Sequence, residues 1–318
     1  LICISKAKEN MPYPIENKLV IAVASSALFN LIESDSVFKT QGESIYREYQ
    51  ENRLDIPFEK GVAFPFIKRL LSLNQSFPEE QPIEVVLLSR NSPETGLRVF
   101  RSIQSYGLNI SRAYFSSGQN NFQYLPAFNA SLFLSANSND TRSAIENGFA
   151  AGTVLNKVVV DDDDDMELRI GFDFDGVLAD DASEQVYKKA NGNMNEYFEH
   201  EKEHAADPLA KGPIGNLLQK ISFFQKMEKK RAKADPAYRR VLKTAIITAR
   251  NAPAHERVIT TLKNWEVEVD DAFFLGGIDK ARVLNILKPH IFFDDQMVHL
   301  NHIDKIPAVH IPFGIANK

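Results

Sequence analysis

The sequence has almost no cysteine, since Cys3 is the single one among 318 residues. A disulfide framework is therefore excluded, and the chain fits a reducing compartment. The sequence also lacks an apolar run of the roughly 20 residues that a membrane-spanning helix needs. Its opening segment, "LICISKAKEN", acquires charge too early for a secretory signal peptide. We therefore expect a cytoplasmic protein with no membrane partner.

An excess of positive charge is absent as well. Lysine and arginine number 37 against 42 aspartate and glutamate residues, the formal net charge is −5, and no Lys/Arg block occurs. Such a chain has no general attraction for nucleic acid, so an anionic ligand would need a local cationic site. The hydrophobic content of 44% is that of an ordinary globular protein, and the length suffices for about two domains.

Strand-like runs such as "KLVIAV" and "IEVVLLS" alternate with helical periods such as "FPFIKRLLSL". This alternation is typical of parallel βαβ units covered by helices. Five consecutive aspartates, Asp161 to Asp165, interrupt it. Because like charges repel and neighbouring side chains do not converge on one ion, we expect an extended linker here and not a metal site.

The chain beyond the aspartates repeats the chain before them. "IEVVLLSRNSP" (83–93) matches "KTAIITARNAP" (243–253), and residues 113–137 match residues 272–296 without a gap. Several matches in one order indicate an internal duplication. We therefore divide the chain into a tail (1–16), a first half (17–158), an acidic linker (159–166) and a second half (167–318).

Polar side chains follow four strand-like runs of the second half, at the point where each run ends: Asp173 and Asp175, then Thr248, then Lys280, then Asp294 and Asp295. The carboxyl ends of parallel strands share one edge of a sheet, where ligands of such proteins bind. Several carboxylates beside one lysine would repel each other without a cation, and oxygen ligands suit Mg²⁺. Lysine and threonine would hold the oxygens of a phosphate, so the set fits phosphoryl transfer.

This order of D-x-D-x-V, threonine, lysine and Asp-Asp resembles the haloacid dehalogenase (HAD) superfamily of phosphotransferases. The segments "VAFPFIKRLL", "SRNSPETGLRVFRSIQSYGL", "YFEHEKEHAADPLAKGP" and "LKPHIFFDDQM" are similar to the cytosolic 5'-nucleotidase I family, and the similarity runs from Lys18 to Gly314. It implies a HAD-like Rossmannoid α/β fold, a parallel sheet with a helical cap at about 181–240. It also implies Mg²⁺-dependent hydrolysis of nucleoside 5'-monophosphates, typically AMP.

The resemblance also implies roles for single residues. Asp173 would be the nucleophile that forms an aspartyl-phosphate, and Asp175 would be the general acid and base. Asp294, the Asp173 carboxylate and the Asp175 carbonyl would hold Mg²⁺, with Asp295 beside them. The substrate-binding candidates are Gly176, Ala249 and Arg250 near the phosphate and Phe198, His200 and Lys211 in the cap. For Arg250 a structural salt bridge is an equal alternative.

Three other functions stay open. The chain could be a HAD phosphatase or phosphotransferase for another small phosphate ester, or a nucleotide-binding regulator without turnover. "HEKEH" (200–204) also matches the H-E-x-x-H zinc pattern, although a turn follows where a third ligand would be needed. A regulatory nucleotide and a homo-oligomer remain open as further partners.

The first half lacks the charged residues of this set. The alignment puts Val23 at Asp173, Ser25 at Asp175, Leu88 at Thr248, Asn121 at Lys280, and Ser135 with Ala136 at Asp294 with Asp295. Joint loss of the acids and the lysine is coherent, because neither charge is tolerated in a buried pocket without the other. We expect this degenerate half to be a scaffold for the second.

Overall fold

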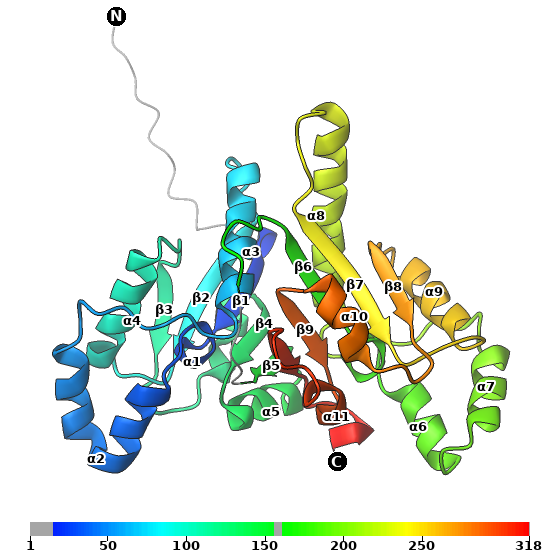
Figure 1. Ribbon diagram of the computed structural model, residues 1–318, viewed down its shortest axis with the longest axis horizontal. Coiled ribbons are helices and arrows are strands. Elements are labelled where there is room, and N and C mark those ends of the chain that lie inside the picture. Colours follow the sequence, from blue (N-terminus) through cyan, green and yellow to red (C-terminus); the bar gives the residue numbers. More distant parts are fainter. Residues whose placement is uncertain (1–14, 156–160, 318) are drawn as a thin grey trace, which may run out of the picture.

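The computed structural model describes residues 15–155 and 161–317, so Cys3 and most of the expected tail lie outside the described residues. Ten strands form one sheet in the order β3-β2-β1-β4-β5-β10-β9-β6-β7-β8 (Figure 1). The strands are β1 (Leu19–Val23), β2 (Ile83–Ser89), β3 (Arg112–Phe115), β4 (Ala130–Ser135), β5 (Ala151–Val154), β6 (Leu168–Phe172), β7 (Leu242–Thr248), β8 (Asp271–Phe274), β9 (Ile291–Asp294) and β10 (Ala308–His310).

The two halves of the chain meet at the centre of this sheet. Strands β1 to β5 and strands β6 to β10 follow the same order outward from the centre, where β5 pairs with β10. That central pairing is antiparallel and joins Val154 to Val309 and Thr153 to His310, whereas the other strand pairs among the described residues are parallel. The expected α/β class with a mostly parallel sheet is confirmed, and both halves share one sheet.

Helices cover both faces of the sheet, which explains why every residue of β1 and β2 is buried. Helix α3 contacts both β2 and β6, and α8 contacts both β7 and β4. Each of these helices therefore packs against strands of both halves. None of the described helices is both long and apolar enough to cross a membrane. The helices are α1 (Ser25–Leu28), α2 (Ile32–Glu51), α3 (Phe64–Ser76), α4 (Pro93–Ser105), α5 (Ser138–Glu146), α6 (Ala182–Lys189), α7 (Met194–Glu203), α8 (Gly215–Ala234), α9 (His255–Asn264), α10 (Lys280–Leu287) and α11 (Met297–Leu300).

Two helical excursions leave the sheet at corresponding places in the two halves. Helix α2 is bent at Gly42, whose φ of 82° breaks the helical backbone, and the pair α6–α7 turns at Gly192 with a φ of 77°. They occupy the two lower corners of Figure 1. Helix α8 also lies in the region expected to form a cap (181–240), but it packs against β7. The excursion beyond the carboxyl ends of the strands is therefore α6–α7 (Figure 1).

The described aspartates of the acidic run, Asp161 to Asp165, form a turn and not the extended segment expected from their repulsion. Asp161 pairs with Arg69 at 2.8 Å, and Asp163 pairs with Lys60 at 3.0 Å and Lys68 at 2.6 Å. These cations come from α3 or the segment before it, so attraction between the run and the first half offsets the repulsion within the run.

Candidate active site

The turn after β6 carries the first two acids. The Asp173 amide donates to the Phe293 carbonyl at 2.8 Å, and its Oδ1 accepts from the Phe174 amide at 2.7 Å. The next residues form η4 (Phe174–Leu178), a π-helical turn in which Gly176 has a φ of 69°. A Cβ on Gly176 would lie 2.5 Å from Asp295 Oδ2, so this position requires glycine for both its backbone and its neighbour.

Lys280 joins the acids of two strands. Its Nζ lies 2.8 Å from Asp173 Oδ2 and 2.7 Å from Asp294 Oδ2, and all three side chains are buried. Thr248, at the end of β7, accepts the Arg250 amide on its Oγ1 at 3.2 Å. The structure therefore brings together the strand-end residues that the sequence singles out.

Burial and charge act against each other in this cluster. Burial raises the pKa of Asp173 to about 7, although Lys280 lowers it. Burial also opposes the ionisation of Asp294, but Lys280 and His299 outweigh burial and lower its pKa. Burial disfavours the Lys280 ammonium, yet Asp173 and Asp294 raise its pKa above the ordinary value. One lysine thus stabilises an acidic centre that burial alone would neutralise.

The donor set fits a divalent cation. Ligand atoms of Asp173, Asp294 and His299 lie within 4.8 Å of one another. Among the described residues, neither carboxylate oxygen of Asp295 has a hydrogen-bond partner, although both are buried. Burial, Asp173 and Asp294 raise the pKa of Asp295 to about 9. A divalent cation beside these carboxylates would favour their ionised form, because its charge offsets their mutual repulsion.

A cavity of about 590 Å³ opens above this cluster. Its floor includes five of the expected site residues, namely Asp173, Asp175, Thr248, Ala249 and Arg250. The pair α6–α7 supplies another wall with Glu184, Tyr187, Lys188, Met194 and Tyr197. Residues of α6–α7 and the acids Asp173 and Asp175 therefore line the same cavity.

The expected cap contacts Phe198, His200 and Lys211 lie elsewhere. Phe198 packs against Tyr197 with ring centroids 5.7 Å apart, and Lys211 donates to Asn216 at 2.9 Å. The His200 ring stacks on His204 at 4.2 Å. None of the three is among the residues that line the cavity.

The "HEKEH" helix does not assemble a zinc site. His204 directs its Nδ1 to the His200 carbonyl at 2.8 Å. Within residues 15–155 and 161–317, the triad of candidate metal ligands that meets in space is Asp173, Asp294 and His299. Glu201, the second residue of the motif, is fully buried and pairs with two arginines.

Arg250 is engaged by the protein itself. Its Nε and Nη2 each donate to one oxygen of Asp175 at 2.7 Å, which is the bidentate geometry of a strong pair. Its Nη1 donates to Glu201 of α7. Arg250 was expected either to contact the substrate or to form a structural salt bridge, and the structure contains the salt bridge.

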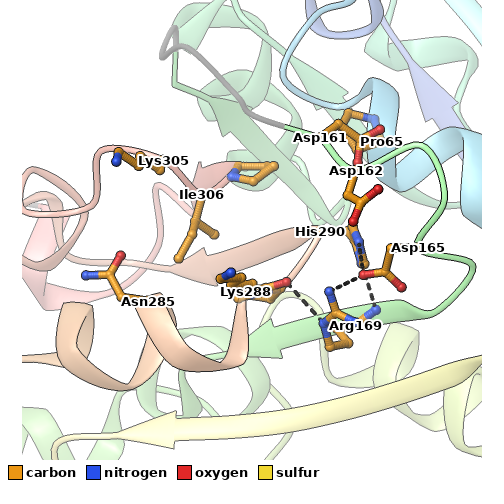
Figure 2. Close-up of a pocket in the computed structure, with 12 residues that line it drawn as sticks. Pro65, Asp161, Asp162, Asp165, Arg169, Asn285, Lys288, His290, Lys305 and Ile306 are labelled. Carbon is orange, nitrogen blue, oxygen red and sulfur yellow. Dashed lines mark hydrogen bonds and ion pairs between the residues drawn. The ribbon is translucent and has the colours of Figure 1, made fainter.

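A second cavity, of about 580 Å³, lies at the opposite ends of the strands (Figure 2). Arg169 and His290 there flank Asp165, with Arg169 Nη2 2.5 Å and His290 Nε2 3.6 Å from Asp165 Oδ2. These residues lie at the amino ends of β6 and β9, whereas Asp173 follows the carboxyl end of β6. The cavity is therefore distant from the acidic centre along the strands.

Hydrogen bonds fix how the first half matches the site. The Ala24 amide donates to Leu134 as the Asp173 amide does to Phe293, each at 2.8 Å, so Ala24 and not Val23 takes the nucleophile position. The shift has a local cause. The Phe29 amide donates to the carbonyl of Ser25, four residues earlier. The Ala179 amide donates to the carbonyl of Phe174, five residues earlier. The site turn thus contains one more residue than its counterpart.

Two other positions follow from the same register. Ser89 accepts the Ser116 amide as Thr248 accepts the Leu275 amide, so Ser89 and not Leu88 corresponds to Thr248. Ser135 takes the place of Asp294 as expected, because the Asn137 amide donates to its side chain at 3.1 Å. The first half retains a hydroxyl but lacks the acids.

Several residues of the site were not predicted from the sequence. His299 stands one helical turn beyond the Asp294–Asp295 pair, and that spacing was the available signal for it. Tyr187, Met194 and Tyr197 lie on helices whose orientation over the site is not encoded in a local pattern. Glu201 was visible only within the zinc-like motif.

A mostly parallel α/β sheet with aspartates and a lysine at its strand ends, beneath a helical cap, is consistent with the HAD class of proteins. A family model described as 5'-nucleotidase matches residues 11–318, and the chain belongs to this family. It is 32% identical over 306 residues to the protein named cytosolic 5'-nucleotidase 1B from Homo sapiens, covering 94% of this chain and 49% of that protein. The chain thus spans about half the length of this curated relative. No solved structure matches it significantly.

Proposed function

We propose that the chain hydrolyses nucleoside 5'-monophosphates, AMP foremost, to nucleoside and phosphate. The observation that carries the proposal is the buried bridge from Lys280 to Asp173 and Asp294, because Asp173 also lines the cavity. Family membership and the named relative support the same activity.

In the first step, an Asp173 oxygen bonds to phosphorus while the bond from phosphorus to the ribose 5'-oxygen breaks. The proton that the leaving oxygen needs comes from Asp175. Lys280 and Thr248 neutralise and orient the phosphate oxygens, which is where most of the catalysis of phosphoryl transfer arises. The product on the enzyme is an aspartyl-phosphate.

In the second step, a water oxygen bonds to phosphorus and the bond to Asp173 breaks. Asp175 takes the proton of that water, so it ends the cycle in the form that began it. Its position in the π-helical turn, two residues after Asp173, supports this double duty because both side chains line one cavity.

Mg²⁺ is the cofactor that we propose for this site. Asp173 and Asp294 would hold it with the Asp175 carbonyl, and the imidazole of His299 lies close enough to support it. When bound, the ion would supply charge neutralisation to the phosphate.

The nucleoside would occupy the space beneath α6–α7. Tyr187 and Tyr197 line this wall, and their rings pack edge to face with centroids 6.0 Å apart and an interplanar angle of 80°. Aromatic faces favour the stacking of a flat base. We assign these residues the contact that the sequence suggested for Phe198, His200 and Lys211.

We further propose that the first half arose by duplication and now serves as a scaffold. The shared strand order, the matching amide bonds at Ala24 and Asp173, and the matching bends at Gly42 and Gly192 support a common origin. The central β5–β10 pairing favours a structural role for this half.

Phosphate release from a panel of nucleoside 5'-monophosphates, with Mg²⁺ and after chelation, tests the proposal. We expect release from AMP that stops on chelation and returns with Mg²⁺ but not Zn²⁺. Release from a non-nucleotide phosphate ester alone would favour a different HAD phosphatase. Binding of AMP without release under all conditions would contradict hydrolysis and favour a regulator.

A further inference from the structure

Glu201 is a buried carboxylate that the proposed reaction does not use. It belongs to the cap helix α7 and is 0% exposed, and its oxygens meet four side chains, including the ring of the neighbouring His200 at 3.3 Å from Oε1. Ser183 Oγ donates to Oε1 at 2.8 Å, Arg257 Nη1 donates to Oε1 at 3.0 Å, and Arg250 Nη1 donates to Oε2. The residue therefore ties the cap to α9 and to the end of β7.

Arg250 stands between Glu201 and the site. A guanidinium has five N–H donors. Two of those of Arg250 go to Asp175, one to Glu201 and one to the Ala254 carbonyl at 3.2 Å. The side chain has little donor capacity left for a substrate phosphate, and its planar fork fixes the plane of the Asp175 carboxylate.

We propose that Glu201 and Arg250 are positioning residues for proton transfer: Glu201 fixes the Arg250 guanidinium, and Arg250 in turn aims the carboxylate of Asp175. The inference rests on the proposed function, in which Asp175 moves the proton. It also explains why a charged residue of the cap lies buried beneath the site.

The first half repeats two contacts of this network, with the amide of Gln50 in place of a carboxylate. Gln50 Nε2 donates to Ser34 Oγ at 2.5 Å, and Arg98 Nη1 donates to Gln50 Oε1 at 3.1 Å. These contacts repeat those of Glu201 with Ser183 and Arg257. An amide therefore joins the corresponding helices in the first half, whereas the carboxylate of Glu201 also accepts a hydrogen bond from Arg250.

The residue at the position of Arg250 also loses its charge in the first half. The Asn91 amide donates to Ser89 Oγ at 3.2 Å, as the Arg250 amide donates to Thr248 Oγ1 at 3.2 Å, so Asn91 is the counterpart of Arg250. The half without the acids has Asn91 and Gln50, and the half with the acids has Arg250 and Glu201. The ion pair accompanies the acid that it orients.

The decisive variant is Glu201→Gln, with Gln50→Glu as its matched control. Gln50 shows that an amide maintains the serine contact and one arginine contact, and Arg250 keeps Asp175 as a partner, so Glu201→Gln should fold. Because small misplacements of a reacting group are costly, kcat for AMP should fall by about 10- to 100-fold without a rise in KM. Gln50→Glu should leave kcat within about twofold, as expected for a site that is not coupled to the reaction.

A double-mutant cycle separates positioning from stability. If Glu201 acts through Arg250, Glu201→Gln should lower kcat no further in an Arg250→Met chain, which retains Arg257 as the partner of Glu201. Arg250→Lys keeps the charge but loses the fork and should reproduce the loss from the other end. Additive losses, a raised KM with unchanged kcat, or an Arg250→Lys chain with full kcat would each overturn the inference.

The result for the unaltered chain distinguishes the two levels of failure. If this chain releases no phosphate from any nucleoside monophosphate with Mg²⁺, the proposed function fails. If it releases phosphate and Glu201→Gln behaves like Gln50→Glu, the proposed function stands and the positioning role alone is refuted. Should Glu201→Gln fail to fold, the Arg250→Lys result still decides.

Discussion

Lys280 is the residue that makes the acidic centre tolerable. Its ammonium is buried between Asp173 and Asp294, so removal of any one of the three would leave an uncompensated buried charge. The first half has Ala24, Asn121 and Ser135 in the corresponding places, which are all neutral. The second half therefore has the lysine together with both acids, and the first half has none of the three charges. This is expected because a buried charge without a partner is costly.

His290 provides a test of burial at a single residue away from that centre. Burial, assisted by Arg69 and Arg169, lowers the pKa of His290 from 6.5 to about 3. The folded chain therefore keeps it neutral while the unfolded chain takes up a proton between these values, so the stability it contributes is lost as the pH falls below 6.5. We expect His290→Asn, whose amide oxygen can still accept the Arg169 amide, to weaken the dependence of the melting temperature on pH between 7 and 4.5. Parallel curves for the two chains would contradict this.

The acids and the lysine could be predicted from the sequence because each follows a strand-like run, and strand ends converge in a parallel sheet. Glu201 and Tyr197 could not, because their approach to the site depends on how α7 folds back over the sheet. Arg250 and its partner Asp175 were predicted, but its second partner, Glu201, was not.

At the scale of elements, the π-helical turn η4 distinguishes the two halves. It contains one residue more than α1 and brings Asp175 to the cavity while Gly176 passes beneath Asp295. Such one-residue expansions of a helical turn are frequent at functional sites. The expansion also accounts for the one-residue difference between the sequence alignment and the strand register, since a gap of this size is invisible between two apolar runs.

We expect Gly176→Ala to be more destabilising than Gly107→Ala, a matched control. Both glycines have positive φ, of 69° and 64°, but a Cβ at Gly107 meets nothing within 4 Å. The backbone conformation alone should cost about 1–2 kcal/mol at either site, and Gly176→Ala should add the clash with Asp295 and lower phosphate release. Urea denaturation and AMP turnover of both variants measure this. Equal losses of stability with unchanged turnover would refute the account of the turn.

The alternation of strands and helices was predictable, because period and apolar content are local. It could not be predicted that α8 packs on the sheet while α6 and α7 leave it, since all three helices have the same helix-forming composition. The contact of α8 with β7 depends on the apolar face that the folded sheet presents.

At the scale of the whole molecule, the halves are parts of one sheet. Strand β5 covers the edge of β10, α3 contacts β6, and Lys220 of the second half donates to Ser131 of the first at 2.7 Å. A scaffold of this kind needs no acids, which fits their absence from the first half.

A truncated chain that starts at Met166 tests the scaffold role. It would leave the β10 edge unpaired and expose the surface of β6 that α3 covers, so we expect it to aggregate or to melt without cooperativity. Circular dichroism melting and gel filtration, with the full chain as reference, would show this. A soluble truncated chain with full activity would refute the role of the first half.

The most direct test of the central claim is phosphate release from AMP with Mg²⁺ by the full chain and by Asp173→Asn. Asparagine is similar in size to aspartate but does not attack phosphorus, so we expect the variant to remain folded and to release no phosphate while the unaltered chain turns over. Release by the variant at the rate of the unaltered chain would contradict the assignment of Asp173 as the nucleophile.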